Sequence, residues 1–192
     1  MLTNDTLDVV GEDFAALIAA AKQGDEAAFS TLWRDANPSL LRYLRVVTPH
    51  HADDVAAETW VQVLRGLAQF TGDEGAWRAW LFTTARRRVL DQVRHRARHP
   101  AEPIDDIHTS EMPRAAAAEQ LAMDNMATER AMALVSRLPE QQAEVIMLRV
   151  VAGLETDVVA EMLGRSPGAV RVAAHRGLKK LATLLSEAGV TL

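Results

Sequence analysis

The segment from Leu154 to Leu181 reads LETDVVAEMLGRSPGAVRVAAHRGLKKL. Gly164 is the residue type that takes a left-handed backbone at a helix end, and Ser166 followed by Pro167 is a favourable helix start. The segment therefore predicts two helices joined by a tight turn, with the second helix beginning at Pro167. A helix-turn-helix of this kind places its second helix in the major groove of DNA.

The predicted second helix separates an apolar side from a basic side. Val170, Ala174 and Leu178 recur every four residues, so we expect them to face the first helix. Arg171 is the best candidate for reading guanine, whose two acceptors a guanidinium can bind together. The remaining predicted contacts to this DNA are Arg165, Ser166, His175, Arg176 and Lys179. A helical hairpin with an ordinary solvated basic face is the plainer interpretation, but the coincidence of cap, turn and basic face favours DNA binding.

Charge is unevenly distributed along the chain. The formal net charge is −5, from 21 Lys+Arg and 26 Asp+Glu. Two basic islands lie within this acidic chain: the first runs from Arg86 to His99, and the second from Arg165 to Lys180. A basic stripe on an acidic body is typical of a DNA-binding face, and two islands indicate two contacts on one DNA.

Composition excludes several classes of protein. The 192-residue chain has no cysteine, which excludes disulfide scaffolds and thiolate zinc sites. No segment approaches the roughly 18 apolar residues of a membrane span, and the acidic N-terminus differs from a signal peptide. We therefore expect a cytoplasmic protein without membrane insertion. No nucleophile-base-acid set or glycine-rich phosphate loop is visible, so we expect neither enzymatic activity nor a cofactor.

Apolar residues recur at helical spacing along almost the whole chain, which predicts an all-α fold. The first expected helices cover about 14–24, a segment from Asp25, and a further segment after Pro38 that ends before Pro49. The later ones cover about 52–70, 76–98, 115–137 and 139–151, and the helix-turn-helix follows. Residues 99–114 contain three prolines and clustered acids without apolar periodicity, which indicates a flexible linker. The predicted architecture is a helical bundle at 12–98 joined by this linker to a four-helix domain at 115–188.

Three motifs occur in an informative order. They are ADDVAAETWVQVLRGLAQF at 52–70, WRAWLFTTARRRVLDQVRHRAR at 77–98 and LPEQQAEVIMLRVVAGLETDVVAEMLGRSPGAVRVAAHRGLKKL at 138–181. In this order the chain resembles the extracytoplasmic-function (ECF) sigma factors of bacterial RNA polymerase over nearly its whole length. The resemblance implies an alternative sigma factor whose N-terminal domain melts the downstream promoter element and whose C-terminal domain recognises the upstream element. The implied partners are promoter DNA, core RNA polymerase through its β′ coiled coil and β flap, and an inhibitory anti-sigma factor.

The resemblance also implies roles for two N-terminal helices. The helix at 52–70 docks on the β′ coiled coil in such proteins, and its candidate contacts here are Asp53, Asp54, Glu58, Thr59 and Gln62. Asp54, Glu58 and Val61 share one face by their three- and four-residue spacing. The helix at 77–98 binds the downstream element, and its candidate contacts are Trp77, Arg86, Arg87, Arg88, Arg94 and Arg96. An aromatic ring and several cations suit this role, because extruded bases need faces to stack on and the single strand needs positive charge. The neighbouring Trp80 and Leu81 are expected to pack in the core.

Three other interpretations remain open. His51, Asp54 and Glu58 could converge on a divalent metal, although helix starts are often polar through capping alone. A free-standing helix-turn-helix repressor or activator would bind duplex DNA unaided and would not need the Asp54 and Glu58 face. A helical enzyme or scaffold with a fortuitous basic hairpin would leave the paired basic islands unexplained.

Overall fold

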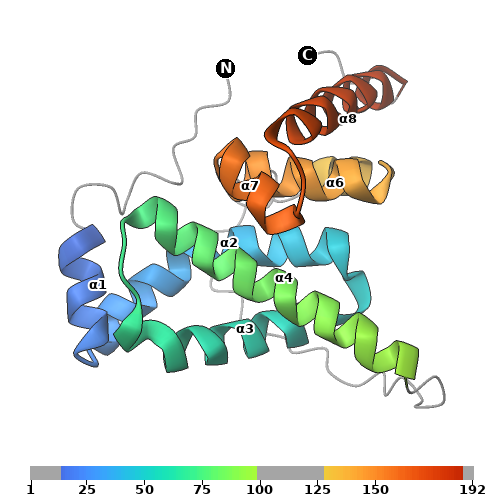
Figure 1. Ribbon diagram of the computed structural model, residues 1–192. Coiled ribbons are helices and arrows are strands. Elements are labelled where there is room, and N and C mark those ends of the chain that lie inside the picture. Colours follow the sequence, from blue (N-terminus) through green and yellow to red (C-terminus); the bar gives the residue numbers. More distant parts are fainter. Residues whose placement is uncertain (1–13, 99–127, 188–192) are drawn as a thin grey trace, which may run out of the picture.

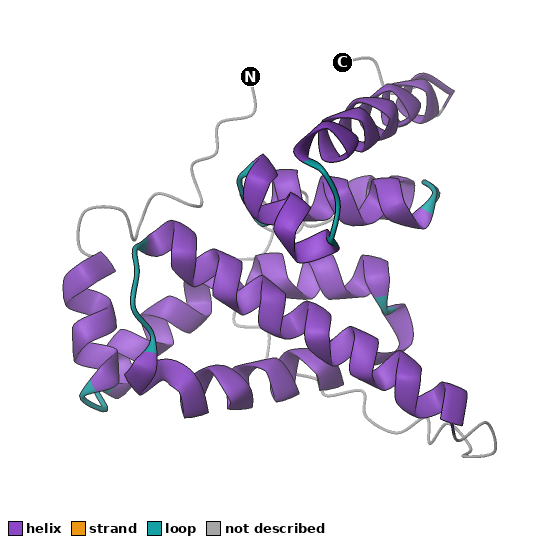
Figure 2. Ribbon diagram, in the orientation of Figure 1, coloured by secondary structure: helices purple, strands orange, loops and turns teal. Residues whose placement is uncertain are grey.

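A computed structural model describes residues 14–98 and 128–187 of the chain (Figure 1). Every regular element in these residues is helical (Figure 2), so the predicted all-α fold is confirmed. None of these helices has the length and apolar content that a membrane span requires. The predicted linker at 99–114 lies outside the described residues.

The N-terminal part of the structure is a bundle of helices joined by short turns. Its elements are α1 (Phe14–Lys22), α2 (Glu26–Val47), the 3-10 turn η1 (Pro49–His51), α3 (Ala52–Gly66), the 3-10 turn η2 (Leu67–Gln69) and α4 (Glu74–Arg98). Asp25 caps α2 by accepting from the backbone N–H groups of Ala27 and Ala28. Asp73 accepts from the backbone N–H of Ala76 at 2.8 Å in the first turn of α4. These carboxylates pair helix-end donors that otherwise lack partners, which explains where α2 and α4 start.

Helix α2 runs unbroken through Pro38, where the sequence predicts two segments. Proline removes one backbone hydrogen bond and disfavours a helix interior. Ala36, Ser39 and Leu40 around it are nevertheless buried, and the Ser39 hydroxyl donates to the carbonyl of Ala36 at 2.9 Å. Burial of both halves against one core outweighs the local cost of the proline.

An aromatic cluster joins α1, α3 and α4. The ring of Trp77 lies at its centre, with the centroids of Phe14 and Trp60 at 6.5 Å, Phe70 at 5.6 Å and Trp80 at 5.7 Å. Tilted and edge-on rings at such distances are favourable arrangements, so this cluster supplies much of the N-terminal core.

Gly66 at the end of α3 makes room for this cluster. A Cβ atom at that position would lie 2.8 Å from Cζ2 of Trp80. The missing side chain therefore lets α3 and α4 approach closely at this point.

The C-terminal part contains the predicted helix-turn-helix. Residues 128–135 are helical, and they are followed by α6 (Glu140–Ile146), the π-helical turn η3 (Met147–Val151), α7 (Thr156–Leu163) and α8 (Pro167–Glu187). In η3 the backbone N–H of Ala152 donates to the carbonyl of Met147 at 2.9 Å, one residue further back than in an α-helix. This widened turn leads directly into the loop before α7.

The two parts pack against each other through α2. This helix lies against both α6 and η3, and in Figure 1 the group α6 to α8 lies above the N-terminal bundle. Leu40, Tyr43 and Leu44 of α2 are fully buried, as are Met147 and Leu148 of η3. The sequence predicts two domains on a tether, and the structure adds a buried interface between them.

Candidate DNA-binding and polymerase-binding surfaces

The turn of the helix-turn-helix has the predicted geometry. Gly164 follows α7 with φ of 63° and ψ of 39°, which is the left-handed region. The hydroxyl of Ser166 accepts from the backbone N–H of Ala169 at 3.2 Å, and α8 begins at Pro167. The predictions for the helix stop, cap and start are therefore confirmed.

The inner face of α8 differs from the prediction at one position. Val170 is buried as expected, but Leu178 is 51% exposed and Gly177 takes the inner place. In a helix of 3.6 residues per turn, a seven-residue step returns to nearly the same face, whereas an eight-residue step overshoots it. A Cβ atom at Gly177 would lie 2.6 Å from Cδ1 of Ile146, so α6 and α8 meet across this glycine. The prediction that Leu178 faces the first helix is wrong.

The outer face of α8 and the turn before it carry the predicted upstream-element contacts. All of these side chains are exposed, namely Arg165, Ser166, Arg171, His175, Arg176 and Lys179. Arg165 and Arg176 line one groove between α8 and the start of α6, together with Val172 and Ala173. Val172 is 49% exposed, so an apolar side chain lies among the cations on this surface.

The first basic island lies on the second half of α4. Arg87 and Arg94 are exposed, and Arg94 also pairs with Asp91 on the same helix at 3.4 Å. Arg88 is half-buried, whereas Arg86 points toward the C-terminal part. The side chain of Arg96 lies outside what the structure describes.

Arg86 forms an ion pair between the two parts of the molecule. Its Nε donates to Oε1 of Glu144 in α6 at 2.9 Å, and the two side chains are 22% and 20% exposed. The same carboxylate oxygen accepts from the hydroxyl of Tyr43 at 3.4 Å. Burial raises the pKa of Tyr43, and the charge of Glu144 raises it further, so the phenol stays a neutral donor.

The aromatic residues of α4 depart from the prediction at Trp77, whereas Trp80 packs against the core as expected. Trp77, predicted to contact DNA, is 1% exposed at the centre of the aromatic cluster. Trp80, predicted in the core, is half-buried and stacks on Phe70 at 5.2 Å with ring planes 20° apart. Leu81 is fully buried, as predicted. The assignment of Trp77 to an extruded base is therefore wrong, because its ring faces are covered by protein.

The exposed face of α3 is acidic at its start. Asp53, Asp54 and Glu58 are exposed, and Gln62 is half-buried. Thr59 is fully buried, and its hydroxyl donates to the carbonyl of Val55 at 2.6 Å. The assignment of Thr59 to polymerase binding is therefore wrong, because helical back-bonding lets this polar side chain point into the core.

Apolar residues extend the acidic surface of α3. Val61 is 44% exposed and Leu64 is 53% exposed. Val61 lies three residues after Glu58, on the face that the spacing predicts, whereas Leu64 is an addition that sequence reasoning missed. Its exposure could have been inferred from its neighbour Val63, which occupies the buried side.

The structure offers no support for a metal at the start of α3. In residues 14–98 and 128–187, no three His, Cys, Asp or Glu side chains gather closely enough to hold a metal ion.

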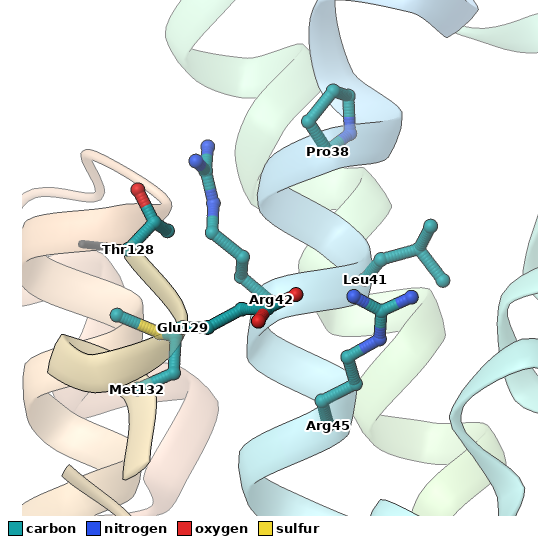
Figure 3. A pocket seen from close by; sticks show the side chains of 7 residues that line it. All are labelled: Pro38, Leu41, Arg42, Arg45, Thr128, Glu129 and Met132. Atoms are coloured by element: carbon teal, nitrogen blue, oxygen red, sulfur yellow. The ribbon is translucent and has the colours of Figure 1, made fainter. Parts of the chain in front are cut away.

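A groove lies between α2 and residues 128–132 (Figure 3). It is lined by Pro38, Leu41, Arg42, Arg45, Thr128, Glu129 and Met132. Burial lowers the pKa of Arg42, whose Nε makes no hydrogen bond within the described part of the chain. The groove marks a second place where the N-terminal bundle meets the C-terminal part.

Comparison with known proteins identifies both parts of the chain. The family model for Sigma-70 region 2 matches residues 32–99, and the model for Sigma-70, region 4 matches residues 128–181. The ECF RNA polymerase sigma factor ShbA of Streptomyces griseus subsp. griseus is 33% identical over 197 residues, which cover 97% of this chain and 100% of that protein. The ECF RNA polymerase sigma factor SigD of Mycobacterium tuberculosis is 32% identical, over 96% of this chain and 89% of that protein.

Solved structures share the fold. CnrH in complex with the cytosolic domain of CnrY matches with a TM-score of 0.57 and 24% identity, over 90% of this chain and 96% of that chain. The sigma factor RpoE, in complex with the anti-sigma factor NepR from Bartonella quintana, matches with a TM-score of 0.58 and 21% identity. The match covers 82% of this chain and 96% of that chain. Full-length similarity above 30% identity, with both sigma regions in order, shows that the chain belongs to the ECF RNA polymerase sigma factors.

Proposed function

We propose that three separate surfaces of this sigma factor divide the work of promoter recognition. The protein is an alternative sigma factor that binds core RNA polymerase and directs promoter-specific initiation, and it is not an enzyme. The assignment of surfaces to partners rests on one observation: two exposed basic helix faces, on α4 and α8, accompany an exposed acidic face on α3. The functional units correspond to residues 12–98 and 115–188.

The upstream promoter element binds to α8. Arg171 lies in the first turns of that helix, where side chains of a recognition helix reach base edges. Arg165, Arg176 and Lys179 are exposed cations suited to phosphates, and Ser166 and His175 add polar contacts. Val172 and Ala173 offer no polar group to the bases, so part of the selectivity comes from DNA shape.

The downstream element binds to the basic half of α4. Arg87, Arg88, Arg94 and Arg96 supply cations that follow a single strand, and Arg86 joins them when it leaves Glu144. Among the aromatic residues of α4, Trp80 replaces Trp77 as the candidate for stacking on a base, because part of its ring is exposed.

Core RNA polymerase binds to α3 through its β′ coiled coil. Asp53, Asp54, Glu58 and Gln62 give this face its polar groups, and Val61 gives it an apolar side chain. The C-terminal part binds the β flap. Acidic side chains at the start of the face, followed by exposed apolar ones, combine the polar and apolar contacts that protein interfaces use in general.

Two further features complete the proposal. An anti-sigma factor holds the protein inactive, by analogy with the related fold of RpoE, which was solved with NepR. The protein works in the cytoplasm, where the polymerase and the chromosome lie.

Run-off transcription with purified bacterial core polymerase tests the function. The template is fragmented chromosomal DNA of the source bacterium, and RNA 5′ ends are mapped. We expect discrete starts with the wild type and their loss with Asp54→Asn/Glu58→Gln, which also fails to retain core in a pull-down. The matched control Glu26→Gln/Glu187→Gln removes the same charge at exposed positions elsewhere. Retention of core by the α3 variant would contradict the proposed docking face.

A further inference from the structure

The ion pair between Arg86 and Glu144 ties a DNA-binding residue to the other domain. Arg86 is the first cation of the basic island on α4, and Glu144 lies in α6, 58 residues later in the chain. Each side chain is only about a fifth exposed, so water screens the pair less than it screens a surface pair. The contact therefore holds α4 against the C-terminal part.

Neighbouring groups reinforce this contact. Tyr43 of α2 is fully buried and donates to the same oxygen of Glu144. Eight residues before Arg86, Arg78 pairs with Asp35 and Glu74 of the N-terminal bundle. Its Nη1 also lies close to the loop that precedes α7, where a Cβ atom at Gly153 would lie 3.4 Å away. Two arginines of α4 thus face the C-terminal part, while Arg87 remains exposed.

A phosphate and a carboxylate compete for the same guanidinium. Arginine binds both through charge-assisted hydrogen bonds of similar geometry, so Arg86 cannot donate Nε to DNA while it donates Nε to Glu144. Because the carboxylate also offsets the charge of Arg86, full release of the guanidinium to a phosphate costs whatever free energy the pair contributes to closure.

We propose that Glu144 is a latch that closes the free sigma factor by holding Arg86, and that release of Arg86 to the DNA backbone opens the two domains. The latch makes free protein a weak DNA binder, and DNA supplied in the polymerase complex replaces the carboxylate. This inference rests on the proposed role of the α4 cations in DNA binding.

Two measurements on the full-length protein test the latch: the distance between its N-terminal and C-terminal parts, and its affinity for DNA. Because the chain has no cysteine, Ala68→Cys and Ala182→Cys place one dye on each part at exposed positions. We expect Glu144→Gln to lower energy transfer between the dyes. The same substitution should tighten binding to a random-sequence duplex with a melted centre by about twofold to tenfold.

Two comparisons separate a latch from a simple loss of negative charge. Glu155→Gln removes one charge from an 85% exposed side chain in the same part of the protein and should change neither measurement. In an Arg86→Ala background, Glu144→Gln should no longer tighten DNA binding, because the residue that it frees is gone. An equal gain in both backgrounds would overturn the latch and leave only general electrostatics.

A second variant tests the latch if circular dichroism shows that the Glu144→Gln protein does not fold. Tyr43→Phe deletes the other donor to Glu144 and should shift both measurements in the same direction by a smaller factor. Unchanged energy transfer and affinity in the folded variants would overturn the proposal.

Run-off transcription by the same proteins keeps the two claims distinguishable. If the wild type gives promoter-specific starts while the variants leave the distance unchanged, the latch is wrong and the proposed function stands. If the wild type neither joins core nor directs starts, the proposed function is wrong and the latch falls with it.

Discussion

The indole N–H of Trp60 in α3 donates to the side-chain oxygen of Asn37 in α2 at 2.9 Å. Trp77 is buried more deeply, at 1% exposed against 7% for Trp60, yet its indole nitrogen has no acceptor within the described residues. Two tryptophans of one aromatic cluster therefore differ in hydrogen bonding, and this difference should decide which of them tolerates replacement by phenylalanine.

We expect Trp60→Phe to cost about 1 kcal/mol more in free energy of unfolding than Trp77→Phe. The first change removes a hydrogen bond and leaves the Asn37 oxygen without its donor. The second leaves a similar cavity but also removes a buried N–H that has no partner. Urea unfolding of the two variants measures the difference, and a larger cost for Trp77→Phe would contradict this explanation.

Contact between α6 and α8 across Gly177 predicts sensitivity to a larger side chain. Gly177→Leu should destabilise the protein by about 1–3 kcal/mol, because the added atoms overlap Ile146 in a packed interface. Gly168→Ala in the same helix is the control. Its Cβ atom would meet nothing closer than Ser166 Oγ at 4.0 Å, so the gain in helix propensity should leave stability equal or higher. Equal destabilisation by both substitutions would contradict this explanation. It would show that α8 is sensitive to any substitution, and that the close approach at Gly177 is not the cause.

The raised pKa of Asp35 leads us to expect a specific dependence of stability on pH. Burial raises the pKa of its carboxyl group, and the Arg78 guanidinium at 4.0 Å opposes this rise only in part. The folded state therefore keeps the proton to higher pH than the unfolded state, whose aspartates titrate near pH ~4. As the pH rises from the unfolded pKa through the folded pKa, the contribution of Asp35 to stability falls.

Asp35→Asn removes this titration. The free energy of unfolding of the variant, relative to wild type, should increase with pH across that window and then become constant. Chemical unfolding of both proteins at a series of pH values measures the difference. A relative stability that is flat or falls with pH would contradict a raised pKa.

Arg171 and Lys179 should differ in the kind of DNA binding that they support. Arg171→Ala should lose about 1–3 kcal/mol on the preferred upstream element and relax its base preference. Lys179→Ala should weaken binding to all sequences alike and reduce the slope of log affinity against log salt by about 1. Binding titrations of holoenzyme on matched and mismatched elements at several salt concentrations measure both effects. A loss of base preference in the Lys179 variant would reverse the two assignments.

Local features of the fold were predictable because their causes lie within a few residues. Gly164, Ser166 and Pro167 specify the helix stop, cap and start through their own backbone and side-chain chemistry. The order of motifs likewise identified the family, since each motif is a continuous segment.

Features that depend on helix rotation or on distant partners were not predictable. Trp77 and Trp80 lie three residues apart on one side of α4, and only the arrangement of α1 and α3 decides which ring is covered. The polar side chain of Thr59 suggests a surface position, but its hydroxyl donates to a carbonyl of its own helix and the residue is buried. The pairing of Arg86 with Glu144 joins parts of the chain whose relative placement no local pattern encodes.

Footprinting of a promoter obtained from the run-off experiment tests the division of labour between α8 and α4 most directly. Permanganate detects unpaired thymines, and DNase protection detects the upstream contact. We predict that reactive thymines downstream appear only with core polymerase and this protein together, that Arg171→Ala weakens the upstream protection, and that Arg87→Ala/Arg94→Ala reduces the melting. The contrary result is that the protein protects duplex DNA on its own and that adding core polymerase leaves the reactivity of the thymines unchanged. That result would contradict the division of labour between α8 and α4 and would identify a free-standing regulator.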